Sequence, residues 1–264
     1  MSPNESALVT RWESFVQKTQ QRFDETLTES TQLLIEQLQD TDYDYQTVFR
    51  TWSAVKNQIF QLIDTIDNAW NHKVEPLLKK EGDAWYTVRL SVGDIENNLH
   101  QRLEVHDLYI QGKLSELQYQ HLLPNVNKDY NCTQCGAIVR INPKIFRAQY
   151  ITCNACNTTN TIDLETNYVH LVHQLESIAA YQNLELFKTM QSALAELQAE
   201  RPPAPEHLWN AYQTAYENYQ NAKLESLQTL RTLSEEEVQT KREKFQNELN
   251  EFINIQKHNK YGEN

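Results

Sequence analysis

The chain has 264 residues, a formal net charge of −12 and only 5 glycines. This glycine content, about 2% against an average near 7%, excludes most glycine-dependent architectures, among them nucleotide-cradling folds, propellers and turn-rich β-sandwiches. The acidic charge argues against long-range attraction to nucleic-acid phosphates or anionic lipids. A mainly helical protein remains.

Apolar residues in the first part of the chain recur at helical spacing. Ser2 and Glu5 are spaced as a capping box, and the apolar stripe that follows continues in steps of three and four to Leu38. An acidic turn at residues 40–42 then precedes a second long helix, which we expect to be perturbed at Pro76. The pattern predicts two long amphipathic helices.

A third stripe begins at Trp85, after Gly82, which is suited to end the previous helix. Its spacing to Leu103 fits a helix, although residues 86–92 alone also alternate like a strand. The length of the stripe favours the helix. Gly112 and Pro124 are expected to bracket a further short helix.

Between residues 131 and 162 the helical period disappears, β-branched residues become common and acidic residues are absent. Helical spacing returns at Leu164 and ends before Pro202. A second capping box, Ser234 with Glu237, introduces a terminal helix. We therefore predict three regions, with a helical region at 1–125, a small separate module at 126–163, and a helical region at 164–264 that packs with the first.

All the cysteines lie in this module, as two close pairs. Cys132 with Cys135 and Cys153 with Cys156 are CxxC pairs, separated by 17 residues. A tight turn with two intervening residues points both sulfurs at one place, and two such turns supply the four thiolates of a tetrahedral zinc site. Gly136, directly after the first pair, suits a turn that needs a permissive backbone.

At these residues the chain resembles the zinc-ribbon module, in which two cysteine knuckles joined by an antiparallel hairpin hold a zinc ion. The resemblance covers about residues 130–163 and implies a metal and a small fold, without a function. We expect residues 137–142 and 147–152 to form the hairpin, with 159–163 as a third strand. The predicted fold class is mainly α, an elongated antiparallel helical bundle of coiled-coil-like helices with an inserted small β zinc ribbon.

Three interpretations of the cysteines are open. A closed structural zinc site would staple a module too small to build its own core. A redox dithiol would place a cysteine at a helix N-terminus, whereas strand-like sequence follows Cys135. Catalytic zinc needs an open coordination position, which four thiolates fill. The pattern favours the structural site.

The module carries Arg140, Lys144 and Arg147 with no compensating acid between residues 131 and 162. These cations predict a contact surface. It would serve a protein partner, the acidic helices of the chain itself or, as an alternative, nucleic acid, with Phe146 and Tyr150 available for base stacking. A zinc ion with four thiolates carries a charge of −2, which offsets most of this positive charge.

His170 and His173 lie about one helical turn apart, which suits a second metal site or a pair of ordinary helix histidines, and the missing Glu-x-x-His spacing favours the latter. No nucleophile elbow or phosphate-binding loop is present, so we predict that the chain is not an enzyme. An active site shared with a partner would be the remaining enzymatic role.

Residues 1–15 have no basic segment followed by an apolar core, and no apolar run is long enough to span a membrane, so we expect neither secretion by the common route nor a membrane span. Clustered cysteines favour a reducing compartment, and we expect a cytoplasmic protein. The leading hypothesis is a zinc-binding interaction or scaffold protein that displays a structural zinc ribbon on long helices. The alternative is a nucleic-acid-binding regulator that uses the basic face of the ribbon. Aromatic stripes suit an internal core and a dimer seam equally, so the oligomeric state stays open.

Overall fold

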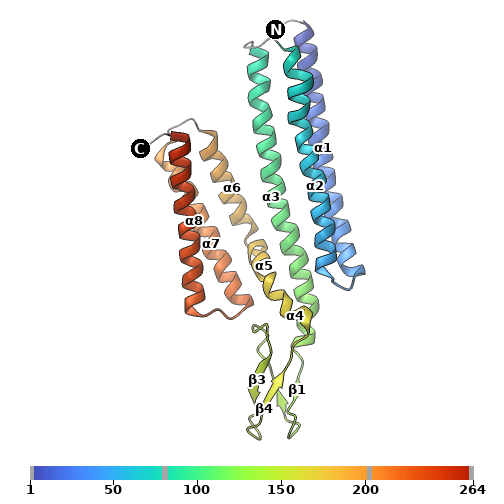
Figure 1. Cartoon of the computed structure of the whole chain (residues 1–264), viewed down its shortest axis with the longest axis vertical. Helices are drawn as coiled ribbons and strands as arrows, with labels where there is room; N and C mark the ends of the chain where they lie inside the picture. Colours follow the sequence, from blue (N-terminus) through green and yellow to red (C-terminus); the bar gives the residue numbers. More distant parts are fainter. Residues whose placement is uncertain (1–2, 79–82, 201–203, 262–264) are drawn as a thin grey trace. The chain divides into compact units, whose positions relative to one another are not determined.

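The computed structural model of the chain describes residues 3–78, 83–200 and 204–261. It is mainly α-helical with a small β insert, as predicted from the sequence (Figure 1). Its contacts define two compact units, Met1–Ile110 and Gln111–Asn264. The boundaries predicted at 126 and 163 are based on helical periodicity and not on contacts, so they stay a prediction. The packing of region 164–264 with the first region also stays a prediction.

Two long helices, α1 (Pro3–Asp40) and α2 (Tyr45–Ala69), form a hairpin in the first unit. Asp44 caps α2, because its carboxylate accepts the backbone N–H groups of Gln46 and Thr47. Trp12, near the start of α1, meets Trp70, just after the end of α2, with ring centroids 6.0 Å apart. The two helices are therefore antiparallel. The predicted cap Ser2 lies outside the described residues.

Helix α2 is perturbed ahead of Pro76, as expected. A π-helical turn (Trp70–Val74) and a 3-10 turn (Glu75–Leu77) follow it. Proline has no N–H for the carbonyl one turn earlier and its ring crowds that carbonyl, so proline in a helix interior kinks or breaks the helix. The predicted stop at Gly82 lies outside the described residues.

Helix α3 (Asp83–Val126) completes the first unit and continues into the second. Residues 86–92 are helical, so the prediction of a helix and not a strand for the stripe that begins at Trp85 is confirmed. The predicted short helix bracketed by Gly112 and Pro124 is wrong, because α3 passes through both residues. Gly112 lies where α5 approaches closely, and Pro124 lies so near the end of α3 that few hydrogen bonds are lost.

Contacts between α3 and the α1–α2 hairpin define a three-helix bundle. Phe60 lies by His100, and Trp52 donates to Asp107, so α2 and α3 run in opposite directions. The core of this unit consists of the predicted apolar stripes, with these large side chains under 2% exposed: Phe23, Leu34, Leu38, Trp52, Ile59, Ile63, Ile66, Trp70 and Leu99.

The second unit contains the end of α3, the β insert and five helices, α4 (Thr166–His170), α5 (Leu175–Gln182), α6 (Leu184–Ala199), α7 (Glu206–Leu230) and α8 (Glu235–Tyr261), with a 3-10 turn (Leu171–His173) after α4. The predicted capping box is confirmed, since Ser234 and Glu237 exchange hydrogen bonds of 2.9 and 3.1 Å. No helix in the described ranges is both long and apolar enough to cross a membrane.

The β insert has four short strands, β1 (Tyr130–Asn131), β2 (Ile138–Val139), β3 (Gln149–Thr152) and β4 (Thr159–Ile162). Strand β1 pairs with β2, and β3 pairs with β4, each antiparallel. The expected hairpin of 137–142 with 147–152 is therefore wrong. The side chain of Gln149 connects these two segments instead. Its Oε1 accepts the Asn142 N–H at 2.8 Å, and its Nε2 donates to the Asn142 carbonyl at 2.7 Å.

Candidate metal centre

Each cysteine pair lies in the turn of one of these two hairpins, and the two turns have the same backbone hydrogen bonds. Gly136 N–H donates to the Cys132 carbonyl at 2.9 Å, and Asn157 N–H donates to the Cys153 carbonyl at 2.8 Å. Both donors have a positive φ, 73° at Gly136 and 60° at Asn157. This left-handed backbone suits Gly and Asn best among the residues. Both CxxC pairs are therefore held in matching knuckles.

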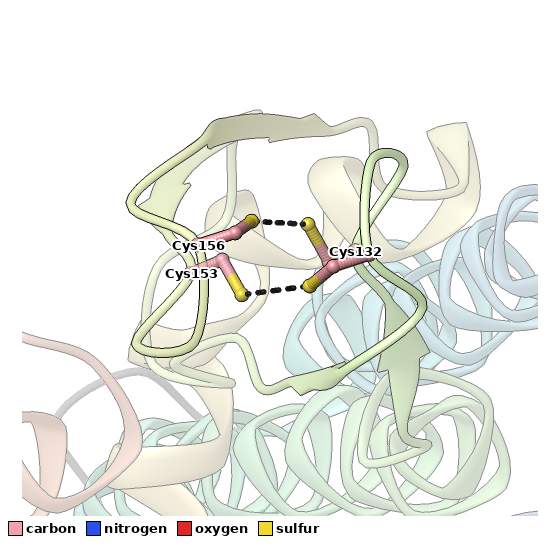
Figure 2. Close-up of side chains that lie close together, drawn as sticks. Cys132, Cys153 and Cys156 are labelled. Carbon is pink, nitrogen blue, oxygen red and sulfur yellow. Dashed lines mark hydrogen bonds between the residues drawn. The ribbon is translucent and has the colours of Figure 1, made fainter.

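The two knuckles bring all four cysteine sulfurs together. The atoms lie within 4.8 Å of one another. Cys132 Sγ is 3.6 Å from Cys156 Sγ, and Cys135 Sγ is 3.7 Å from Cys153 Sγ. Figure 2 shows the side chain of Cys132 pointing from one loop toward Cys153 and Cys156 on the opposite loop. Cys132 and Cys153 are buried, while Cys135 is exposed.

These distances fit a metal ion better than a disulfide. A disulfide would bring two sulfurs to about 2.05 Å. Four thiolates at about 2.3 Å from a tetrahedral zinc ion lie about 3.8 Å apart, close to the distances of 3.6 and 3.7 Å given above. The donor set is therefore suited to a divalent ion that accepts four soft ligands.

The surroundings of the sulfurs shift the pKa values of Cys132 and Cys135 in opposite directions. The backbone amides of Cys135 and Gln134 lower the pKa of the Cys132 thiol to about 6. The backbone amide of Ala137 lowers the pKa of the Cys135 thiol. The nearby thiols together have a larger effect in the opposite direction, and the pKa of Cys135 is raised to about 12. Sulfurs this close repel one another as thiolates, so a cation among them is needed before all four ionise together.

Asn160 on β4 joins the two knuckles and is only 3% exposed. Its side-chain oxygen accepts the Thr133 N–H at 2.9 Å, and its amide nitrogen donates to the Thr158 carbonyl at 3.1 Å and lies 3.5 Å from Cys132 Sγ. One side chain thus fixes the first knuckle relative to the second. Such outer hydrogen bonds orient the ligands of a metal site.

Sequence reasoning missed Asn157 and Asn160. The signal for Asn157 was its position directly after the second CxxC pair, which matches that of Gly136 after the first. Asn and Gly are the residues that most readily adopt a left-handed backbone. Asn160 had no comparable signal, since its role depends on the pairing of β3 with β4.

A loop of the insert, residues 142–148, is anchored to the helices of the same unit. Phe146 is buried and packs against Tyr168 of α4, and the Tyr168 hydroxyl donates to the Pro143 carbonyl. Thr232 N–H donates to the Lys144 carbonyl at 3.2 Å. Phe146 is therefore not available for base stacking, contrary to expectation, whereas Tyr150 is 75% exposed.

The three predicted contact cations lie at different points of the insert. Arg140 directly follows β2 and forms an exposed ion pair of 2.9 Å with Asp129, an acid just outside the acid-free segment. Lys144 and Arg147 lie in the anchored loop with exposed side chains.

His170 ends α4 and His173 lies in the following 3-10 turn, both exposed. Within the described ranges, the cysteine cluster is the one group of three or more metal-ligating side chains. Scans against protein-family models, curated proteins and solved structures gave no match for this chain.

Proposed function

We propose that the four cysteines bind one zinc ion in a structural zinc-ribbon-like module, and that the chain is a cytoplasmic interaction or scaffold protein whose helices hold this module for a protein partner. The observation that carries the proposal is the convergence of four cysteine sulfurs within 4.8 Å of one another. Four thiolates complete a tetrahedral shell and leave no position for a substrate. We therefore assign the zinc a structural and not a catalytic role.

The anchored loop supports a display role for the rest of the module. One side of the insert is held by Phe146 and Lys144, while two large apolar side chains on its strands face solvent, Ile138 at 60% exposure and Tyr150 at 75%. Tyrosine is enriched in protein interfaces because it combines apolar area with a polar tip. These two side chains are the contact residues that we propose for the partner.

The zinc assignment is tested by metal content. Purified wild-type protein is expected to hold one zinc ion per chain by mass spectrometry, and Cys153→Ser to hold much less, because an incomplete thiolate set binds weakly. Ala155→Ser is the matched control, since it places a serine at an exposed position of the same knuckle. Metal-free wild-type protein with a folded insert would contradict the assignment.

The partner role is tested by affinity purification with the wild type and an Ile138→Ala, Tyr150→Ala double variant. A control variant, Leu33→Ala, removes an apolar side chain of similar exposure, 63%, from α1. We expect the double variant to lose proteins that the wild type and the control retain. The same proteins in all three samples would remove the basis for this role.

The nucleic-acid alternative has weaker support, because Phe146 is buried and Arg140 is already paired. A filter-binding titration across salt concentrations separates the two roles. Phosphate contacts make affinity fall steeply as salt rises. Salt-sensitive binding that Arg147→Glu abolishes would favour the alternative.

A further inference from the structure

The helical part of the second unit contains a cavity that the zinc site does not use. Glu176 and Ala179 of α5 line it, together with four residues from each of two further helices, Gln220, Lys223, Leu224 and Leu227 of α7 and Lys241, Lys244, Phe245 and Glu248 of α8. Steps of three and four residues place each set on one face of its helix. The cavity has a volume of about 120 Å³. One water needs only roughly 10–15 Å³ of such space, so a small molecule fits.

Three lysines and two glutamates line this cavity, and the glutamates already have partners. Glu176 accepts from Lys241 at 2.5 Å. Glu248 lies 3.8 Å from Lys244 and accepts from the Tyr216 hydroxyl at 3.5 Å.

Lys223 differs from the other two lysines. Its ammonium lies 5.7 Å from the centre of the Tyr219 ring, and it has no carboxylate at ion-pair distance among the residues that the structure describes. Burial lowers the pKa of Lys223, and Lys241 and Lys244 act in the same direction, against Glu176 and Glu248. Grouping these ammonium groups therefore costs free energy, which an anion in the cavity would offset.

The rest of the lining is apolar, from Ala179, Leu224, Leu227 and Phe245. Pockets that combine an apolar surface with a few convergent charges bind organic molecules with one charged end. The largely exposed Lys244, at 74%, leaves the cavity open to solvent. We propose that this cavity binds a small organic oxyanion, with its phosphate or carboxylate head at Lys223, Lys241 and Lys244 and its apolar body against Phe245.

Calorimetric titration of the full-length protein with phenyl phosphate, benzoate and uncharged benzamide tests the proposal. We expect at least one of the two anions to bind at one site per chain, and benzamide to bind much more weakly. Lys223→Met removes the ammonium group but keeps a side chain of similar length, so the affinity for the anion should fall by about tenfold or more. Lys188→Met removes an exposed lysine of α6 and should leave affinity unchanged.

Lys244→Glu provides a second variant whose folding is not at risk, because the side chain is mostly exposed. It reverses a charge at the cavity and should abolish binding. The bound anion should also raise the melting temperature of the wild type and not of Lys223→Met. The proposal is overturned if neither anion binds, if benzamide binds as well as the anions, or if Lys188→Met weakens binding as much as Lys223→Met does.

Discussion

The ring of Phe146 lies nearly parallel to the ring of Tyr168, with centroids 4.8 Å apart and planes inclined by 13°. Phe146 belongs to the β insert and Tyr168 to α4, and both belong to one core cluster, with Leu171, Leu175, Leu227 and Leu230. The insert is therefore joined to the helices by a hydrophobic contact as well as by the backbone. The four-cysteine cluster lies between the two knuckles of the insert, and this contact holds its 142–148 loop.

Phe146→Ala is expected to reduce the free energy of unfolding of the second unit by about 3 kcal/mol, because it removes a buried ring and leaves a cavity. Urea unfolding monitored by circular dichroism measures the loss. Tyr150→Ala removes an exposed aromatic ring from the same insert and should change stability by less than about 0.5 kcal/mol. Equal effects of the two variants would contradict the anchoring role of Phe146.

Asn160→Ala should weaken metal binding while keeping all four thiolates. Outer hydrogen bonds to a metal site are worth about 10- to 100-fold in affinity, and Asn160 bonds to both knuckles. Competition with a chromophoric chelator measures the change. Asn154→Ala, at an exposed position between Cys153 and Cys156, is the matched control and should bind zinc as the wild type does. Unchanged affinity in Asn160→Ala would show that the knuckles hold their relative position without it.

Gly112→Ala should destabilise the second unit although alanine favours helices. An added Cβ would lie 2.1 Å from Tyr181 Cβ and 2.6 Å from the Ser177 carbonyl oxygen of α5, so backbone has to move. Such overpacking costs about 1–3 kcal/mol.

Gly93→Ala in the same helix should instead stabilise the protein. Nothing lies within 4 Å of the added Cβ at that position. Helix propensity alone then predicts a gain of about 0.5–1 kcal/mol in the free energy of unfolding. Thermal unfolding of the two variants should therefore shift in opposite directions, and a shift of the same sign would contradict the close approach at Gly112.

His106 on α3 gives the first unit a dependence of stability on pH. Its Nε2 lies 3.1 Å from the Thr31 hydroxyl, and its ring is 5.6 Å from that of Trp52. Burial lowers the pKa of His106 from 6.5 to about 4, against the opposing charge of Asp107. As the pH falls from 6.5 to 4, His106 is therefore protonated in the unfolded chain but stays neutral in the folded chain.

The first unit therefore keeps its full stability above pH 6.5, and its free energy of unfolding falls as the pH drops below 6.5, by about 3 kcal/mol at pH 4. Urea unfolding at several pH values, followed by tryptophan fluorescence, should show a steeper loss in the wild type than in His106→Gln. His170→Gln replaces an exposed histidine and should keep the wild-type slope. Parallel slopes for wild type and His106→Gln would contradict a buried neutral His106.

The sequence by itself determined the helical class, the long stripes that end at Leu38 and begin at Trp85, the capping box at Ser234 and the identity of the clustered cysteines. Each of these depends on neighbours a few residues apart, since a helical face repeats every three to four residues and a CxxC turn is local. The same locality made Gly112 look like a helix end, because a stop and a close approach both require glycine.

Only the tertiary structure decided which strands pair and that the Gln149 side chain, in place of strand pairing, bonds to Asn142. It also decided that Asn160 bonds to both knuckles and that Phe146 packs against Tyr168. These contacts join residues distant in the sequence or depend on which backbone groups the pairing leaves free, and no local pattern encodes either. The grouping of Lys223, Lys241 and Lys244 has the same origin. Each lysine alone resembles an ordinary charged helix surface, and packing of α7 against α8 places the three around one cavity.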